Sequence, residues 1–158
     1  MSFNVVLNST NYFSQVDRKG IHEQQYAIDW SFMPDGEYDM TFSFHSASPV
    51  GPNFINAVEL PDLTVFNSYK AADKITANNS HVIGTIRLFW NAKILTAQTI
   101  TATCRASPSD NPPIRCSKPK ANIFAVRLLG DDLAIQSGPV GHYTLILHFE
   151  KVKCCSHT

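Results

Sequence analysis

Hydrophobic and polar residues alternate with a period of two along much of this chain. Apolar side chains occupy every second position from Tyr26 to Phe32 and again from Tyr38 to Phe44. Because successive side chains of a strand point to opposite faces, this alternation predicts half-buried strands. Pro34, Asp35 and Gly36 separate the two runs, and proline and glycine favour the φ values of a turn. We therefore expect a strand, a tight turn and a second strand.

Other short stretches have the composition of strands and are separated by Gly, Pro, Asn and Asp. They span residues 4–7, 54–60, 63–69, 81–90, 93–103, 122–129, 133–136 and 142–152. Helix periodicity is absent, apart from one turn compatible with residues 68–74. Strands at this spacing predict an all-β sandwich or barrel, and 158 residues predict one domain.

Three segments depart from the strand pattern. Residues 105–120 hold four of the nine prolines, and we expect an irregular excursion toward a partner. Residues 1–10 are expected to form an arm that adds to a neighbouring sheet, and residues 151–158 a tail that is frayed or docked on a partner. The predicted organisation is therefore one domain over residues 1–158 with these three appendages.

A short motif recurs at an offset of 105 residues. Pro-x-Gly-x-Tyr at 34–38 matches 139–143, and each copy leads into alternating apolar residues. We expect the proline and glycine to bend the chain while the tyrosine places its ring in the core and its hydroxyl at the rim. The structural anchors predicted on this basis are Pro34, Gly36, Tyr38, Pro139, Gly141, Tyr143, Trp30, Phe42, Phe44 and Phe149.

The formal net charge of zero is a cancellation between the two halves of the chain. Residues 1–79 hold 4 Lys and Arg against 9 Asp and Glu, whereas residues 80–158 hold 9 against 4. The overall balance argues against nucleic-acid binding, which needs a basic surface. The asymmetry predicts an ionic subunit interface that weakens with salt. In this hypothesis Arg105, Arg115, Lys118 and Lys120 of one copy face Asp35, Glu37 and Asp39 of a neighbour.

Motifs for nucleophilic, phosphate or metal chemistry are missing from the sequence, so we expect no catalytic residue, metal site or cofactor. His22 to Tyr26 begins like a zinc-protease motif but has tyrosine in place of the second histidine. His142 and His148 share a strand face at a separation of roughly 20 Å, too far for one metal ion. The enzyme alternative, a small hydrolase or carbohydrate-active sandwich, requires carboxylates or histidines to converge in space.

Cysteine usage leaves two readings open. Cys104 and Cys116 flank the Pro-rich stretch and are either ordinary reduced residues or partners in a loop-closing disulfide. Cys154 and Cys155 are adjacent in the tail. The longest uncharged stretch, residues 40–58, contains Pro and Gly, so no membrane span is expected.

Four segments together resemble small structural proteins of large double-stranded DNA viruses and virophages: residues 4–9, 30–38, 110–114 and 141–150. The resemblance implies a single jelly-roll β-sandwich of about eight to ten short antiparallel strands. It further implies a minor capsid or vertex (penton) component beside a larger major capsid protein, located in the virion after assembly in the host cytoplasm. Self-association is expected, with a homo-pentamer favoured for the vertex role and a trimer possible, and no catalytic residues come with the resemblance.

The Pro-x-Gly-x-Tyr start of an aromatic strand is also similar to tumour necrosis factor-like and complement-type globular heads. Those proteins are trimeric jelly rolls that bind receptors or glycans, and they are secreted behind a signal, an anchor or a collagen stalk. This sequence shows none of the three. A receptor or glycan binding module is therefore the second hypothesis.

Overall fold

Two antiparallel sheets form the protein in the computed structural model, which describes residues 1–18, 21–49, 55, 57–66, 81–92, 100–129 and 142–153. The six-stranded sheet contains β1 (Ser2–Asn8), β4 (Glu37–Pro49), β7 (Arg87–Ala92), β8 (Ile100–Ala106), β9 (Ile114–Ser117) and β11 (Tyr143–Lys151). The five-stranded sheet contains β2 (Ser14–Arg18), β3 (Ile21–Ala27), β5 (Ala57–Glu59), β6 (Val82–Thr85) and β10 (Ile123–Leu129). Among the described residues, no helix is long and apolar enough to cross a membrane.

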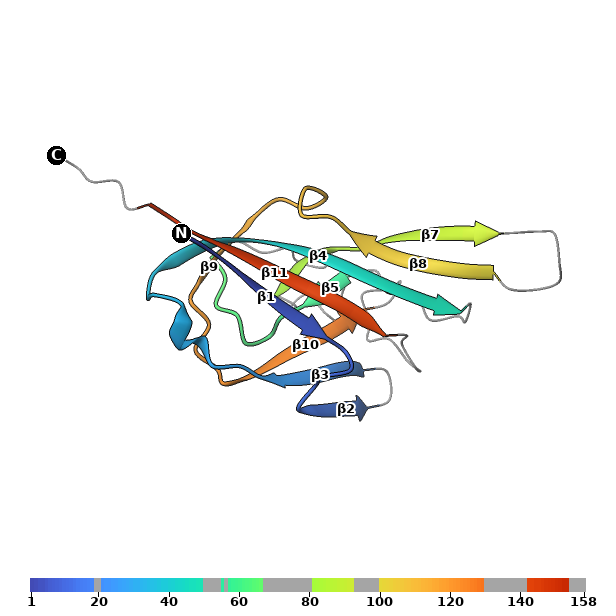
Figure 1. Ribbon diagram of the computed structural model, residues 1–158, viewed down its shortest axis with the longest axis horizontal. Coiled ribbons are helices and arrows are strands. Elements are labelled where there is room, and N and C mark those ends of the chain that lie inside the picture. The colour runs from blue at the N-terminus through green and yellow to red at the C-terminus, as the bar shows by residue number, and fades with distance from the viewer. Residues whose placement is uncertain are drawn as a thin grey trace, which may run out of the picture.

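The order of the strands defines the fold. One sheet runs β1-β11-β4-β8-β7 with β9 also beside β4, and the other runs β2-β3-β10-β5-β6 (Figure 1). Four pairs nest along the chain: β1 with β11, β3 with β10, β4 with β8, and β5 with β6. A long antiparallel hairpin that rolls up on itself produces this nesting, which is the jelly roll. The predicted fold is therefore confirmed.

The core lies between the sheets and follows the period-two pattern of the sequence. In β11 the side chains of Tyr143, Leu145, Leu147 and Phe149 are 0–2% exposed, whereas those between them are half-buried. β10 faces them from the other sheet, with Phe124, Val126 and Leu128 each 0% exposed. Trp30 packs edge-on against Phe124 at a ring separation of 5.2 Å.

The expected strand from Tyr26 to Phe32 is wrong beyond residue 27. β3 ends at Ala27, and Trp30–Phe32 forms a 3-10 turn whose Asp29 side chain accepts a hydrogen bond from the Ser31 N–H at 3.0 Å. The expected hairpin is also wrong, because β3 pairs with β10 and β4 pairs with β11. The 34–36 bend therefore carries the chain from one sheet to the other, with Gly36 at a φ of +144° that favours glycine.

The Pro-rich segment is not the irregular excursion that its composition suggests. β8 and β9 lie one after the other along the same side of β4, at residues 44–49 and 37–40 respectively. Residues 107–113 leave this line and return to it. Asn111 in that loop is 9% exposed and bonds to Thr85 of β6, so the loop closes onto the opposite sheet of the same chain.

Both ends of the chain also differ from their expected roles. Residues 2–8 are not a free arm, since β1 pairs along its whole length with β11. Lys151 of the predicted tail belongs to β11, and the Val152 N–H donates to the Glu37 carbonyl at 3.0 Å. Residues 81–90 contain parts of two strands, β6 and β7, and β2 was not predicted. The expectations for residues 67–80, 93–99, 133–136 and 154–158 fall outside the described residues.

Candidate functional site

Five of the seven charged residues proposed for a subunit interface form ion pairs within the chain. The Arg115 guanidinium contacts the Asp39 carboxylate at 2.7 Å and the Glu37 carboxylate at 3.7 Å. The Lys118 ammonium lies 3.7 Å from the Asp35 carboxylate. The register explains this, because β9 sets Arg115 directly opposite Asp39 of β4. These two bases of the second half of the chain therefore pair with three acids of the first half within one copy, while pairing between neighbouring copies stays a prediction.

These ion pairs are open to solvent. The side chains of Arg115 and Asp39 are 40% and 43% exposed, so salt screens their attraction. The hydrogen bond that Arg115 donates to Asp39, together with the charges of Asp39 and Glu37, raises the pKa of Arg115 above its usual value. The Arg115 guanidinium therefore stays charged and ties β9 to β4.

The remaining members of the predicted set lie in two places. Lys120 is exposed and lines an open pocket of about 330 Å³ with Asp35, Gly36, Glu37, Ser117 and Lys118. Arg105 belongs to β8. It lies opposite His45 of β4 on one side and opposite Arg87 of β7 on the other. The structure therefore brings Lys118 and Lys120 to Asp35 and Glu37, whereas Arg105 lies in a separate row with another arginine and a histidine.

The predicted aromatic anchors lie in the core, as expected. Trp30, Tyr38, Phe42, Phe44, Tyr143 and Phe149 are 0–3% exposed. The Tyr38 hydroxyl donates to the Pro34 carbonyl at 2.5 Å, which closes the bend of the first Pro-x-Gly-x-Tyr copy. In the second copy, the prediction of a hydroxyl at the rim is wrong. The Tyr143 hydroxyl is buried 3.0 Å from that of Tyr26, while Pro139 and Gly141 fall outside the described residues.

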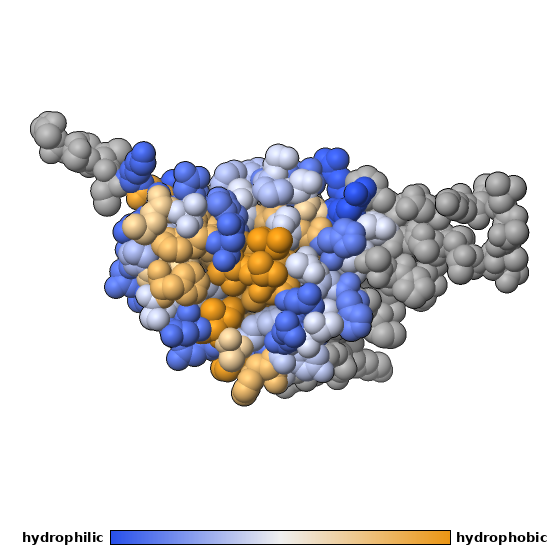
Figure 2. All heavy atoms as spheres, in the orientation of Figure 1, coloured by the Kyte–Doolittle hydropathy of each residue, from blue (hydrophilic) through white to orange (hydrophobic). Residues whose placement is uncertain are grey.

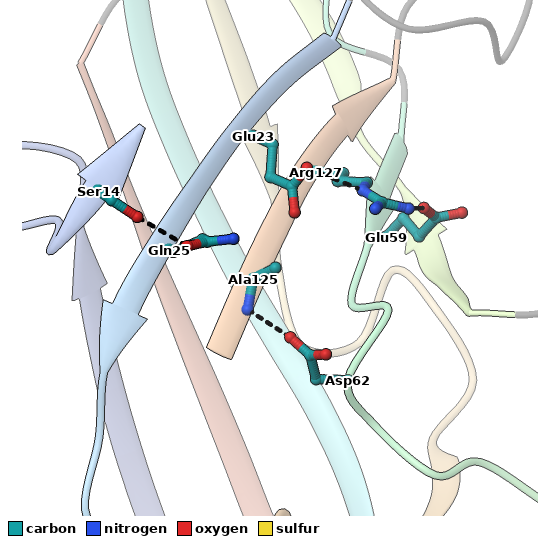
Figure 3. A network of polar contacts seen from close by, with 7 residues as sticks. All are labelled: Ser14, Glu23, Gln25, Glu59, Asp62, Ala125 and Arg127. Carbon is teal, nitrogen blue, oxygen red and sulfur yellow. Dashed lines mark hydrogen bonds and ion pairs between the residues drawn. The ribbon is translucent and has the colours of Figure 1, made fainter. Parts of the chain in front are cut away.

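A buried ionic triad that sequence reasoning missed crosses three strands of the five-stranded sheet (Figure 3). Arg127 of β10 lies 3.3 Å from the Glu23 carboxylate of β3 and 3.1 Å from the Glu59 carboxylate of β5. The glutamate side chains are only 12% and 5% exposed. Burial by itself lowers the pKa of Arg127, but the hydrogen bond to Glu59 and the charges of both glutamates outweigh it and raise that pKa. A lone arginine in the apolar run 123–129 was the available signal.

The two described cysteines are free, which resolves the alternative left open by the sequence. Cys104 and Cys116 are both buried in the six-stranded sheet. Burial, assisted by the charge of Asp39, raises the pKa of the Cys116 thiol to about 12. Burial likewise raises the pKa of Cys104. Because the thiolate is the reactive form, neither is a nucleophile at neutral pH.

The two histidines near the last strand contact residues in β1 or next to it. His148 Nδ1 lies 2.6 Å from Asn4 Oδ1, and His142 Nδ1 lies 3.3 Å from Ser9 Oγ. Across the part of the chain that the structure describes, no three His, Cys, Asp or Glu side chains are grouped so as to hold a metal ion. Comparison with family models, with curated proteins and with solved structures finds no match.

Proposed function

We propose that this chain is a non-enzymatic structural protein that assembles with copies of itself, as a minor capsid or vertex component of a large double-stranded DNA virus or virophage. The observation that carries the proposal is the way in which the segments of the viral resemblance meet. Jelly rolls recur in viral capsids and in lectins, so the fold alone supports a likeness and does not decide the function.

Two of the four resembling segments, residues 30–38 and 141–150, meet in one aromatic cluster, which Phe3 joins from the position just before the first segment. Phe3, beside the first segment in β1, packs edge-on against Phe32 at 5.9 Å and Tyr38 at 6.2 Å. Phe149 of the last segment packs edge-on against Trp30 at 6.1 Å and Tyr38 at 6.2 Å. Segments at opposite ends of the sequence and one near residue 35 therefore build a single end of the sandwich.

The fourth segment, residues 110–114, joins the two sheets. Asn111 accepts the Thr85 N–H and donates to the Thr85 carbonyl, each at 3.0 Å, so its amide acts as a strand partner for β6. Ile114 begins β9 and is 3% exposed. Each resembling segment thus has a role in closing this particular jelly roll, and this shared role supports the family relation more than any single motif does.

Mass spectrometry of purified virus particles tests the proposal directly. We expect the chain in the particles at a copy number well below that of the major capsid protein, and its absence would contradict a capsid role. Light scattering on the purified chain adds the oligomer size. Five copies favour the vertex role, whereas three copies with binding to a glycan or a receptor favour the receptor or glycan binding module, which shares the jelly roll. A strict monomer at high concentration that does not bind the major capsid protein contradicts assembly.

A further inference from the structure

β1 is an edge strand that directs hydrogen-bonding groups away from its own sheet. It ends the six-stranded sheet and pairs with β11 alone among the described strands. The Lys151 N–H donates to the Met1 carbonyl and the Ser9 N–H donates to the Tyr143 carbonyl, each at 3.0 Å. Because hydrogen-bonded pairs alternate in an antiparallel ladder, the odd residues of β1 bond to β11. The N–H and C=O groups of Ser2, Asn4 and Val6 therefore point outward.

This edge lacks the features that usually prevent one edge strand from pairing with another. Ser2–Asn8 contains no charged residue and no proline, and its register with β11 is unbroken, without a bulge. The Val6 side chain is 61% exposed on the outer face of the sheet. Figure 2 shows hydrophobic residues gathered in the middle of the face on which β1 lies in Figure 1. Phe13 and Phe32 are also exposed, by 66% and 47%.

We propose that β1 pairs antiparallel with β1 of a second copy about a two-fold axis at Val5, which joins two six-stranded sheets into one. In this register Asn4 lies opposite Val6 of the second copy and Ser2 lies opposite Asn8. The Asn8 carbonyl also accepts the Asn11 N–H at 2.9 Å. Its second lone pair accepts the Ser2 N–H of the second copy. The inference rests on the proposed assembly role and names the surface that carries it.

Charge favours a second copy as the occupant of this edge. A strand without charges meets its own copy with no like charges opposite each other. Along the outer face, the row of Ser2 continues through Glu150 and Asp39 to Arg115, whereas the row of Asn8 continues through Thr144 to His45 and Arg105. Antiparallel pairing sets the Ser2 row of one copy beside the Asn8 row of the other, so neither row meets its own pattern of charges.

Such a contact closes after two copies, because each uses the same surface. A pentameric or trimeric ring needs a different, head-to-tail contact, and β1 pairing then joins two rings. The β1 contact and ring formation are consequently separate properties, and variants at the edge remove the first without the second.

Three substitutions at two positions of one cross-strand row test the contact. Val6→Lys places a charge on the edge, and Val6→Pro removes an outward N–H without removing a bond to β11. Ser43→Lys is the matched control, since Ser43 lies in the same row on the same face, two strands from the edge. Light scattering should show that the wild type and Ser43→Lys share one mass, and that both Val6 variants have half of it with an unchanged circular dichroism spectrum.

Amide hydrogen exchange by NMR supplies a second readout with a distinctive pattern. The amides of Phe3, Val5 and Leu7 should be protected in every variant, whereas those of Asn4 and Val6 should be protected in the associated wild type and in Ser43→Lys, and the Asn4 amide should lose its protection in both Val6 variants. An oligomer that keeps its mass in both Val6 variants, with fast exchange at Asn4 and Val6, overturns the β1 contact but leaves assembly standing. A wild type that stays monomeric overturns both.

Discussion

Gly84 of β6 lies where the Pro-rich loop meets the opposite sheet, and replacing it with alanine should destabilise the protein strongly. A Cβ at this position would lie 2.6 Å from Asn111 Cγ, 2.7 Å from Phe42 Cε1 and 2.8 Å from Asn111 Oδ1. The Asn111 amide cannot move away without losing its bonds to Thr85 at 3.0 Å, and the Phe42 ring is 3% exposed. Overpacking of this kind costs typically about 1–3 kcal/mol, and we expect about 3 for Gly84→Ala.

A double-mutant cycle with Asn111→Ala separates this clash from a general effect of alanine. Asn111→Ala alone should cost about 1–2 kcal/mol, because it removes hydrogen bonds to Thr85, which water reaches. In the double variant the Cβ added at position 84 still clashes with the Phe42 ring, but the two Asn111 amide atoms with which it clashes are absent. We therefore expect it to be about 1 kcal/mol more stable than the sum of the single changes.

Urea unfolding followed by tryptophan fluorescence measures these free energies, since Trp30 is 3% exposed in the native core. Thermal unfolding should show a Tm lowered by about 6–12 °C in Gly84→Ala, at about 2–4 °C per kcal/mol for a protein of this size. A Gly84→Ala protein within about 0.5 kcal/mol of the wild type, or strict additivity in the cycle, would refute the packing argument.

Four further predictions concern the ionic triad, the buried thiol, the tyrosine pair and salt. Arg127→Met should lower stability to urea by about 2–3 kcal/mol, less than for a fully buried pair because that side chain is 36% exposed. The Cys116 pKa of about 12, above its usual 9, means that unfolding releases a proton at high pH. Native stability should thus be constant below about pH 9 and fall by about 1 kcal/mol per pH unit above it, and Cys116→Ala should make this slope shallower, leaving the part that comes from the raised pKa of Cys104. Tyr26→Phe should lower the free energy of unfolding by about 1–2 kcal/mol in the same assay, because the buried Tyr26 hydroxyl bonds to both Gln24 and Tyr143. Finally, the mass of the oligomer by light scattering should not change between about 0.05 M and about 0.5 M NaCl, since the β1 seam consists of backbone hydrogen bonds and uncharged side chains and the charged residues lie at least one strand back from it.

The sheet architecture could be predicted from the sequence because buried strands keep their period of two. The alternation from Tyr38 to Phe44 continues through β4, and the same pattern marks β11. It failed from Ile28 to Phe32, where Trp30 is buried from a 3-10 turn and not from a strand. β2 was missed because Ser14–Arg18 contains a single apolar residue, and pairing with β3 supplies its backbone partners.

Partnerships between distant residues were beyond the reach of local patterns. A turn motif shows that the chain bends, but not which strand lies beside the next one, so the 34–36 bend suggested a hairpin that does not form. Arg115 meets Asp39, 76 residues away in the sequence, only because β9 returns to β4. Arg127 and its two glutamates come from three separate strands, and nothing in their spacing indicates that they share one site.

The position of β11 also sets the order in which the protein can fold during synthesis. This strand lies between β1 and β4, and its register joins Ser2 to Glu150. The ribosome adds roughly 5–20 residues per second, so β11 is synthesised several seconds or more after β1. During that interval the apolar faces of β1 and β4 have no neighbour between them. Folding is thus expected to be slow and to finish only after β11 emerges, so nascent chains that stall before it are the ones chaperones must hold.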